Sequence, residues 1–166
     1  MGVKVNCELL RKEMLIDGIY KFSVKSPEIA NSARAGQFLE IKVSETGEPF
    51  LRRPISIYNI DKEAGEVEFI FQVKGRGTNL LAERKVGDLI DIMGPLGFGG
   101  FKVQEYNNVS IIGGGIGTYP LYELAKELKG KYIQLTSSDK RVIAHHIYEK
   151  LGYEKYDIVV ANILAD

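Results

Sequence analysis

A run of arginine, proline and serine in a strand-like segment is the first feature of this sequence that could do chemistry. It reads Arg52-Arg53-Pro54-Ile55-Ser56-Ile57. A proline and two guanidinium groups fit a buried strand poorly unless an anion lies beside them. Because a guanidinium can donate two parallel hydrogen bonds to a phosphate, the segment predicts a phosphate contact. A surface salt bridge of Arg53 is the alternative interpretation.

A glycine-rich segment before a short helical pattern is a second candidate for phosphate binding. Gly75-Arg76-Gly77-Thr78 would present backbone N–H groups and the Thr78 hydroxyl at the start of that helix, where such donors can meet a pyrophosphate. An ordinary turn would use the same glycines, so the segment alone does not decide between the two. Two such segments in one small domain favour a single ligand with a diphosphate group.

A third glycine-rich segment, Gly113-Gly114-Gly115-Ile116-Gly117, follows an apolar strand-like run. The general dinucleotide fingerprint, G-x-G-x-x-G, is not met, because Thr118 stands at the position of its third glycine. As a generic signal the run is weak, and a tight strand-to-helix turn without a ligand is the alternative.

Composition narrows the classes of function. The sequence has 22 lysines and arginines and 22 aspartates and glutamates, so net charge gives no reason to expect a nucleic-acid or membrane partner. Its longest apolar runs are short of a membrane span, and charges stand where a signal peptide needs an apolar core. These features indicate a cytoplasmic protein.

Cysteine and histidine give no metal site. Cys7 is the only cysteine, which excludes an internal disulfide and a four-cysteine zinc or iron–sulfur site within this chain; we expect its side chain to be buried. His145 and His146 are adjacent, and neighbouring residues on a helix point about a hundred degrees apart, so they cannot chelate one ion as an i, i+4 pair could. We therefore predict no metal.

The elements that must position these segments change in character near residue 100. Before that point the sequence is strand-like and interrupted by turn signals, which is typical of an antiparallel barrel or sandwich. One short helix is expected from Thr78 to about Arg84, with Thr78 as its N-cap. The six expected strands are residues 3–9, 19–24, 38–43, 53–59, 67–73 and 89–93.

The second half predicts a different architecture, so that the fold class is β plus α/β. After a turn-rich linker at residues 94–100, the pattern favours a βαβαβ unit with a three-stranded parallel sheet. Its expected elements are residues 109–112, 120–128, 132–135, 141–151 and 156–164. The predicted domains are residues 1–100 and 101–166, and an open edge of the small sheet could pair with a second copy as a homodimer.

Five motifs in fixed order carry a resemblance to a known family. They are Gly36-Gln37-Phe38, Arg53-Pro54-Ile55-Ser56, Gly75-Arg76-Gly77-Thr78, Gly94-Pro95-Leu96-Gly97 and Gly113-Gly114-Gly115-Ile116-Gly117. Over about residues 1–129 the chain resembles the ferredoxin reductase superfamily, and within it the electron transfer subunits of dihydroorotate dehydrogenase B. The resemblance implies an N-terminal antiparallel flavin-binding β-barrel that binds FAD, followed by a truncated nicotinamide-binding-like α/β domain.

The resemblance also implies roles for individual residues. Arg53 would hold the FAD diphosphate, and Pro54, Ile55 and Ser56 would lie along the isoalloxazine ring, with Ser56 as the catalytic candidate that hydrogen-bonds near its reactive nitrogen. Further contacts to the cofactor would come from Ile70, Phe71 and Gln72, and at its diphosphate or adenine end from Gly77 and Thr78. A nicotinamide nucleotide would be bound by Gly113, Gly114, Gly115, Ile116 and Gly117.

Beyond about Gly130 the sequence departs from the resembled family, whose members continue with further nicotinamide-site residues and a cysteine cluster for an iron–sulfur centre. With Cys7 alone, no such cluster is expected in this chain. Residues 135–154 resemble the closing segment of N-acetyltransferases, and residues 156–166 resemble a strand of ribosomal protein methyltransferases. We therefore interpret the second half as truncated or rearranged.

The expected function is an FAD-binding electron-transfer module. It would pass electrons from NADH through the flavin to a catalytic dehydrogenase subunit, which in the resembled family serves pyrimidine biosynthesis. A non-catalytic flavin-binding or scaffold chimera without a competent nicotinamide site is the first alternative. A small acetyl or methyl transferase is the second, and it is disfavoured because the sequence lacks an acetyl-CoA pyrophosphate loop.

Overall fold

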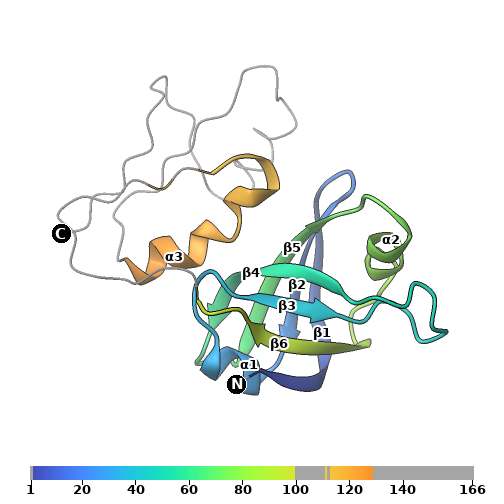
Figure 1. Cartoon of the computed structure of the whole chain (residues 1–166), viewed down its shortest axis with the longest axis horizontal. Coiled ribbons are helices and arrows are strands. Elements are labelled where there is room, and N and C mark those ends of the chain that lie inside the picture. Colours follow the sequence, from blue (N-terminus) through green and yellow to red (C-terminus); the bar gives the residue numbers. More distant parts are fainter. Residues whose placement is uncertain (1, 100–110, 112, 129–166) are drawn as a thin grey trace.

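The computed structural model describes residues 2–99, 111 and 113–128 of the chain. Six strands in this part form a closed antiparallel barrel in the order β1-β2-β5-β4-β3-β6, with β6 paired back to β1 (Figure 1). They are β1 Val3–Ile16, β2 Ile19–Lys25, β3 Phe38–Ile41, β4 Arg53–Asp61, β5 Glu66–Gln72 and β6 Leu89–Leu96. The predicted antiparallel barrel is therefore confirmed.

β1 is longer than predicted and connects the two ends of the sheet. Its first half pairs with β6, and its second half pairs with β2. The predicted strand ended at residue 9, before a charged stretch. The strand can continue through this stretch because the charged side chains of Arg11 and Glu13 are exposed to solvent, while Leu15 beyond them is fully buried. By spanning both neighbours, β1 closes the barrel and removes the free edges that an open sheet would have.

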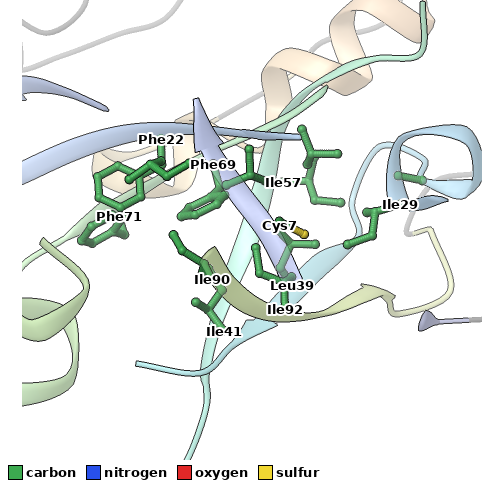
Figure 2. Close-up of a cluster of buried hydrophobic side chains, with 14 of the residues drawn as sticks. Cys7, Phe22, Ile29, Leu39, Ile41, Ile57, Phe69, Phe71, Ile90 and Ile92 are labelled. Carbon is green, nitrogen blue, oxygen red and sulfur yellow. The ribbon is translucent and has the colours of Figure 1, made fainter. Parts of the chain in front are cut away.

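Aromatic and branched aliphatic side chains fill the barrel interior (Figure 2). Phe22 packs edge-on against Phe71, with ring centroids 5.1 Å apart, and lies 5.7 Å from the ring of Phe69. Each such aromatic pair adds about 0.5–1.5 kcal/mol to stability beyond the area it buries. Cys7 lies in the same core, as predicted. The core continues through Leu39, Ile41, Ile57, Ile90 and Ile92 to Ile29.

The helix α1 (Pro27–Ser32) is absent from the predicted elements and lies at one end of the barrel (Figure 1). The Ser26 hydroxyl accepts a hydrogen bond from the N–H of Ile29 at 3.4 Å and caps the helix. Ile29 and Ala30 then enter the core. A serine followed by proline and glutamate is a helix-start pattern, so the sequence does carry a signal for this helix.

The helix α2 (Arg76–Ala82) lies where one was expected, but its N-cap is Gly75 rather than Thr78. The prediction of Thr78 as the N-cap is wrong because its hydroxyl accepts hydrogen bonds from the backbone N–H groups of residues 74 and 75, within the loop before the helix. Lys12 of β1 donates to the carbonyl oxygen of Ala82, the last residue of α2, at 2.5 Å and to that of Arg84, just past the helix, at 3.0 Å. A cation is favoured at that end of a helix.

The predicted linker at residues 94–100 is in part strand, since β6 runs to Leu96. Gly94 permits the tight packing there, because a Cβ on it would lie 2.6 Å from Leu39 Cδ2. Further along, the structure describes a 3-10 turn, η1 (Gly115–Thr118), and a helix, α3 (Leu121–Glu127). α3 confirms the helix predicted at residues 120–128.

The other elements predicted for the second half lie, except for residue 111, outside the described residues. These are the strands at 109–112, 132–135 and 156–164 and the helix at 141–151, together with His145 and His146. The parallel sheet, the domain boundary at residue 100 and the homodimer therefore stay predictions. No helix in residues 2–99 and 113–128 is long and apolar enough to cross a membrane.

The buried position of Cys7 predicts that its thiol reacts slowly with alkylating reagents. Burial raises the pKa of the Cys7 thiol from 9.0 to about 11, and the thiolate is the form that reacts. At pH 8 we expect iodoacetamide to modify Cys7 in the native protein about 100-fold more slowly than in the urea-unfolded protein. A pKa that is two units higher lowers the fraction of thiolate at this pH by about that factor. Mass spectrometry of quenched samples measures both rates. Equal rates would contradict the core position of this residue.

Candidate functional site

Arg53 and Gly77 bring the two predicted phosphate segments together. Arg53 is the first residue of β4, and Gly77 lies in the first turn of α2. A Cβ built on Gly77 would lie 2.4 Å from Arg53 Nε and 2.8 Å from Arg53 Cζ. The guanidinium therefore rests against the backbone of α2, in a space that exists only because residue 77 is glycine.

Arg53 keeps hydrogen-bonding capacity for a ligand. Its Nη1 donates to the backbone carbonyls of Leu51, at 2.6 Å, and Arg52, at 3.3 Å, and these contacts orient the guanidinium. Within the described part of the chain, no carboxylate lies at ion-pairing distance from Arg53. The salt bridge considered as the alternative is thus not seen there, and an anion would meet an unneutralised guanidinium.

Arg52, the neighbouring arginine, has a structural role instead. Its Nη2 donates to both carboxylate oxygens of Asp91 at 2.8 Å, and its Nη1 donates to the backbone carbonyls of Asp91 and Glu40. Charge-assisted hydrogen bonds to the carboxylate and to two carbonyls together fix one geometry of the guanidinium. Arg52 thereby ties the start of β4 to β3 and β6 and sets the position from which Arg53 reaches α2.

Thr78 organises the loop that faces Arg53. Its hydroxyl accepts hydrogen bonds from the N–H groups of Lys74, at 3.0 Å, and Gly75, at 3.3 Å, and donates to the Gly75 carbonyl at 3.1 Å. The hydroxyl is therefore engaged in shaping the turn. Arg76, on the exposed side, pairs with Glu48 at 3.2 Å.

The residues of β4 that follow Arg53 alternate in exposure. Pro54 and Ser56 are exposed, whereas Ile55 is half-buried and packs against the barrel core. Ser56 pairs with Phe38 of β3 in the sheet register. The strand therefore offers a proline and a hydroxyl to a ligand on its outer side, and an isoleucine that supports the wall behind them.

The three neighbouring candidates on β5 also differ in the side of the sheet they face and in their exposure. The ring of Phe71 is in the barrel core and 1% exposed, so a ligand could meet only its backbone. Ile70 faces outward but is also buried, in a second cluster that we call the outer cluster. Gln72, at the end of the strand, is half-exposed. The outer cluster consists of Leu15, Ile19, Tyr58, Ile70 and Tyr119, with Ile16 and Tyr122 packed against it.

The glycine-rich turn, Gly113–Thr118, lies directly before Tyr119, a member of the outer cluster. Its exposed residues are Gly114, Gly115, Ile116 and Gly117. A Cβ on Gly113 would lie 2.8 Å from Leu121 Cδ1 and 3.1 Å from Thr118 Oγ1, so glycine is required for the turn to close. Because Tyr119 and Ile70 share one cluster, the predicted nicotinamide segment and the predicted flavin-lining strand are close neighbours.

Three charged residues of α3 were missed in the prediction from sequence. Glu123, Lys126 and Glu127 all contact the barrel. Their i, i+3 and i+4 spacing puts them on one side of a helix, which is the only signal the sequence offers. The same pattern is also typical of a solvated face. Among the described residues, no group of three or more His, Cys, Asp or Glu side chains could hold a metal ion.

Residues 6–100 match the family model described as the oxidoreductase FAD-binding domain. The chain is also 43% identical over 145 residues to the dihydroorotate dehydrogenase B (NAD(+)) electron transfer subunit of Bacillus pumilus, covering 83% of this chain and 56% of that protein. The corresponding subunit of Bacillus cereus (strain G9842) is 39% identical over 162 residues, covering 96% of this chain and 58% of that protein. The chain thus spans less than three fifths of the length of these relatives.

The match to the Bacillus cereus subunit covers more of the chain than the resemblance over about residues 1–129 implied. A match over 96% of the chain continues beyond residue 129, where we expected the resemblance to end. Among solved structures, an NADH-dependent reduced ferredoxin-NADP oxidoreductase is similar with a TM-score of 0.69 and 35% identity, over 78% of this chain and 46% of that one. A ferredoxin reductase of carbazole 1,9a-dioxygenase has a TM-score of 0.66 and 26% identity, over 76% of this chain and 39% of that one.

The contacts of Gly113 predict a matched pair of variants. Gly113→Ala would press its methyl group on Leu121 and Thr118, and overpacking of this kind costs about 1–3 kcal/mol. Gly117→Ala has no atom within 4 Å of the new Cβ, so it serves as the control. We expect urea unfolding, followed by circular dichroism, to show a lower midpoint for Gly113→Ala than for Gly117→Ala. The same midpoint in both would contradict the described packing of the turn.

Proposed function

This chain belongs to the family of oxidoreductase FAD-binding domains, and we propose that it binds FAD with the diphosphate on Arg53 and the first turn of α2. The observation that carries the proposal is the contact between the Arg53 guanidinium and the backbone at Gly77. It places a cation that has no carboxylate partner among the described residues next to the N–H groups that begin a helix. Both are donors that suit a diphosphate.

The outer side of β4 suits the rest of the cofactor. Ser56 lies three residues beyond Arg53 on the same strand, which corresponds to about 10 Å of strand length. A ribityl chain can span such a distance between a diphosphate and an isoalloxazine ring. We assign the contact with that ring to Pro54 and to the backbone of Ile55, whose side chain packs against the barrel core, and we assign to the Ser56 hydroxyl a hydrogen bond near its reactive nitrogen. Ile70, Gln72 and the backbone of Phe71 would support the ring from β5.

The flavin, when bound, supplies the hydride and single-electron chemistry. The residues of this chain bind and orient it. Arg53 neutralises the diphosphate, the turn that Thr78 shapes holds the α2 N–H groups in place, and Ser56 donates or accepts one hydrogen bond at the ring. Since Arg52 is neutralised by Asp91, Arg53 is the arginine of the pair that remains for the ligand.

We propose NADH as the electron donor and a catalytic dehydrogenase subunit as the acceptor. The relatives described above are named as electron transfer subunits of an NAD(+)-dependent dihydroorotate dehydrogenase. The shared outer cluster supports the proposal, because it puts the turn at Gly113–Gly117 next to the strand that carries Ile70. Hydride transfer needs the two ring systems at near-attack distance. A flavin-binding module that does not accept electrons from NADH is the competing outcome.

FAD binding is tested by two alanine substitutions in one turn. Gly77→Ala places a methyl group where the Arg53 guanidinium lies, whereas Gly75→Ala has no atom within 4 Å of its new Cβ. Hydrogen bonds to charged groups contribute about 1.5–3 kcal/mol each, so we expect Gly77→Ala to weaken FAD binding by tenfold or more. Titration with FAD, read by flavin fluorescence, gives both affinities. If Gly77→Ala binds FAD as tightly as Gly75→Ala does, the diphosphate is held elsewhere.

Electron transfer is tested on the FAD-loaded protein. We expect anaerobic NADH to bleach the visible flavin band, because the turn assigned to the donor lies beside the strand assigned to the flavin. A matched titration with dithionite shows how much flavin can be reduced. Bleaching by dithionite but not by NADH would leave FAD binding in place and contradict NADH as the donor.

A further inference from the structure

Three charged side chains fasten α3 to the barrel, and we call them the α3 clamp: Glu123, Lys126 and Glu127. α3 lies beside β4 in the structure (Figure 1). Each residue of the clamp makes at least one hydrogen bond to a barrel segment that is far away in the sequence. None of the three belongs to the proposed FAD site.

Glu123 is the buried member of the clamp. The residue is 7% exposed. Its Oε2 accepts a hydrogen bond from the N–H of Ile60 at 2.9 Å. The same oxygen accepts a second hydrogen bond from Lys126 Nζ at 3.0 Å. A buried carboxylate is costly unless it is paired in this way, so the contact specifies one placement of the helix.

Lys126 and Glu127 extend the clamp to two further points. Lys126 Nζ also donates to Asn59 Oδ1, at 2.6 Å, and to the carbonyl of Ile60, at 3.3 Å, both on β4. Glu127 Oε1 accepts from the N–H of Ala35, at 2.9 Å, in the loop between α1 and β3. Contacts to β4 and to this loop restrict rotation of the helix as well as its displacement.

Tyrosines continue the attachment toward the glycine-rich turn. The ring of Tyr122 stacks on that of Tyr58, with centroids 4.8 Å apart and planes inclined by 23°. Tyr119 meets Tyr58 edge-on at 6.3 Å. Only Tyr119 and Pro120 separate the turn, which ends at Thr118, from α3. A tilt of α3 would therefore move the turn.

We propose that the α3 clamp positions the turn at Gly113–Thr118 for the nicotinamide nucleotide, relative to the flavin side of the barrel. The inference rests on the proposed function, since it assigns that turn to the nucleotide. A displacement of about 1 Å can slow a reaction between bound groups about a hundredfold. An ion pair adds little net stability over an apolar contact, but it selects one orientation. Glu123, Lys126 and Glu127 are thus positioning residues.

The test compares Lys126→Met with Lys62→Met in the full chain loaded with FAD. Lys126→Met keeps the apolar stem and removes the ammonium that joins Glu123, Asn59 and Ile60. Lys62→Met makes the same change at an exposed lysine in the turn after β4. Glu123→Gln is a second variant, because its amide oxygen can still accept from the Ile60 N–H while the charge is lost.

Hydrogen exchange is the first readout. We expect Lys126→Met to speed amide exchange of residues 113–122 at least tenfold, because even one of the three charged hydrogen bonds that it loses is worth that factor, with no change in Lys62→Met. Glu123→Gln should show a smaller increase. Exchange in Lys126→Met that equals the wild type would overturn the clamp, whatever the protein does with NADH.

Flavin reduction is the second readout. We expect Lys126→Met to slow reduction by NADH in stopped-flow experiments by about tenfold or more, with FAD affinity and reduction by dithionite unchanged. Faster exchange with an unchanged rate of reduction would overturn the positioning role. If the wild type itself is not reduced by NADH, the proposed donor and the positioning role both fail, while hydrogen exchange still decides whether the clamp holds the turn.

Discussion

The guanidinium of Arg53 can lie on the first turn of α2 only because residue 77 has no side chain. This contact depends on features elsewhere in the barrel. β4 must pair with β3 in a register that sets Arg53 opposite Ile41, and Arg52 must be held by Asp91 at the same end of the strand. The Thr78 hydroxyl must in turn shape the loop before α2. The candidate site is thus assembled from two segments, neither of which could form it alone.

The period of two along a β-strand explains why neighbouring residues here serve different ends. Ile70 and Phe71 are adjacent, yet Phe71 packs in the barrel interior and Ile70 packs in the outer cluster. Side chains that face opposite sides of a sheet meet different neighbours. The barrel core can therefore be tightly packed while the outer side of the same strands carries Pro54, Ser56 and Ile70 of the candidate site. A closed barrel is a suitable scaffold for this, because its register cannot slip without moving every apolar side chain to the wrong face.

Local patterns predicted most of the strands, because strand alternation is a local signal, but they left a barrel and a sandwich open, and the family resemblance implied the barrel. A shared ligand for Arg53 and the segment at Gly77 was inferred from two anion-binding signals in one small domain. The rest depended on contacts between distant segments. Thr78 was expected to begin α2, and only the loop geometry shows its hydroxyl turned back to residues 74 and 75. Phe71 was expected to line a cofactor, and sequence did not reveal which side of β5 it faces. Glu123 looked like any carboxylate on a helix until the N–H of Ile60 was placed beside it.

The change of sequence character near residue 100 suggested two separate units, yet the contacts of α3 cross that point. Tyr122 stacks on Tyr58, and Glu123 accepts a hydrogen bond from the end of β4. An aromatic stack alone would allow sliding, because its energy varies slowly with offset. Directed hydrogen bonds do not, since they weaken steeply when misaligned. The combination of an apolar contact that supplies affinity and polar contacts that supply geometry is what a protein needs where two bound groups must meet at a fixed distance.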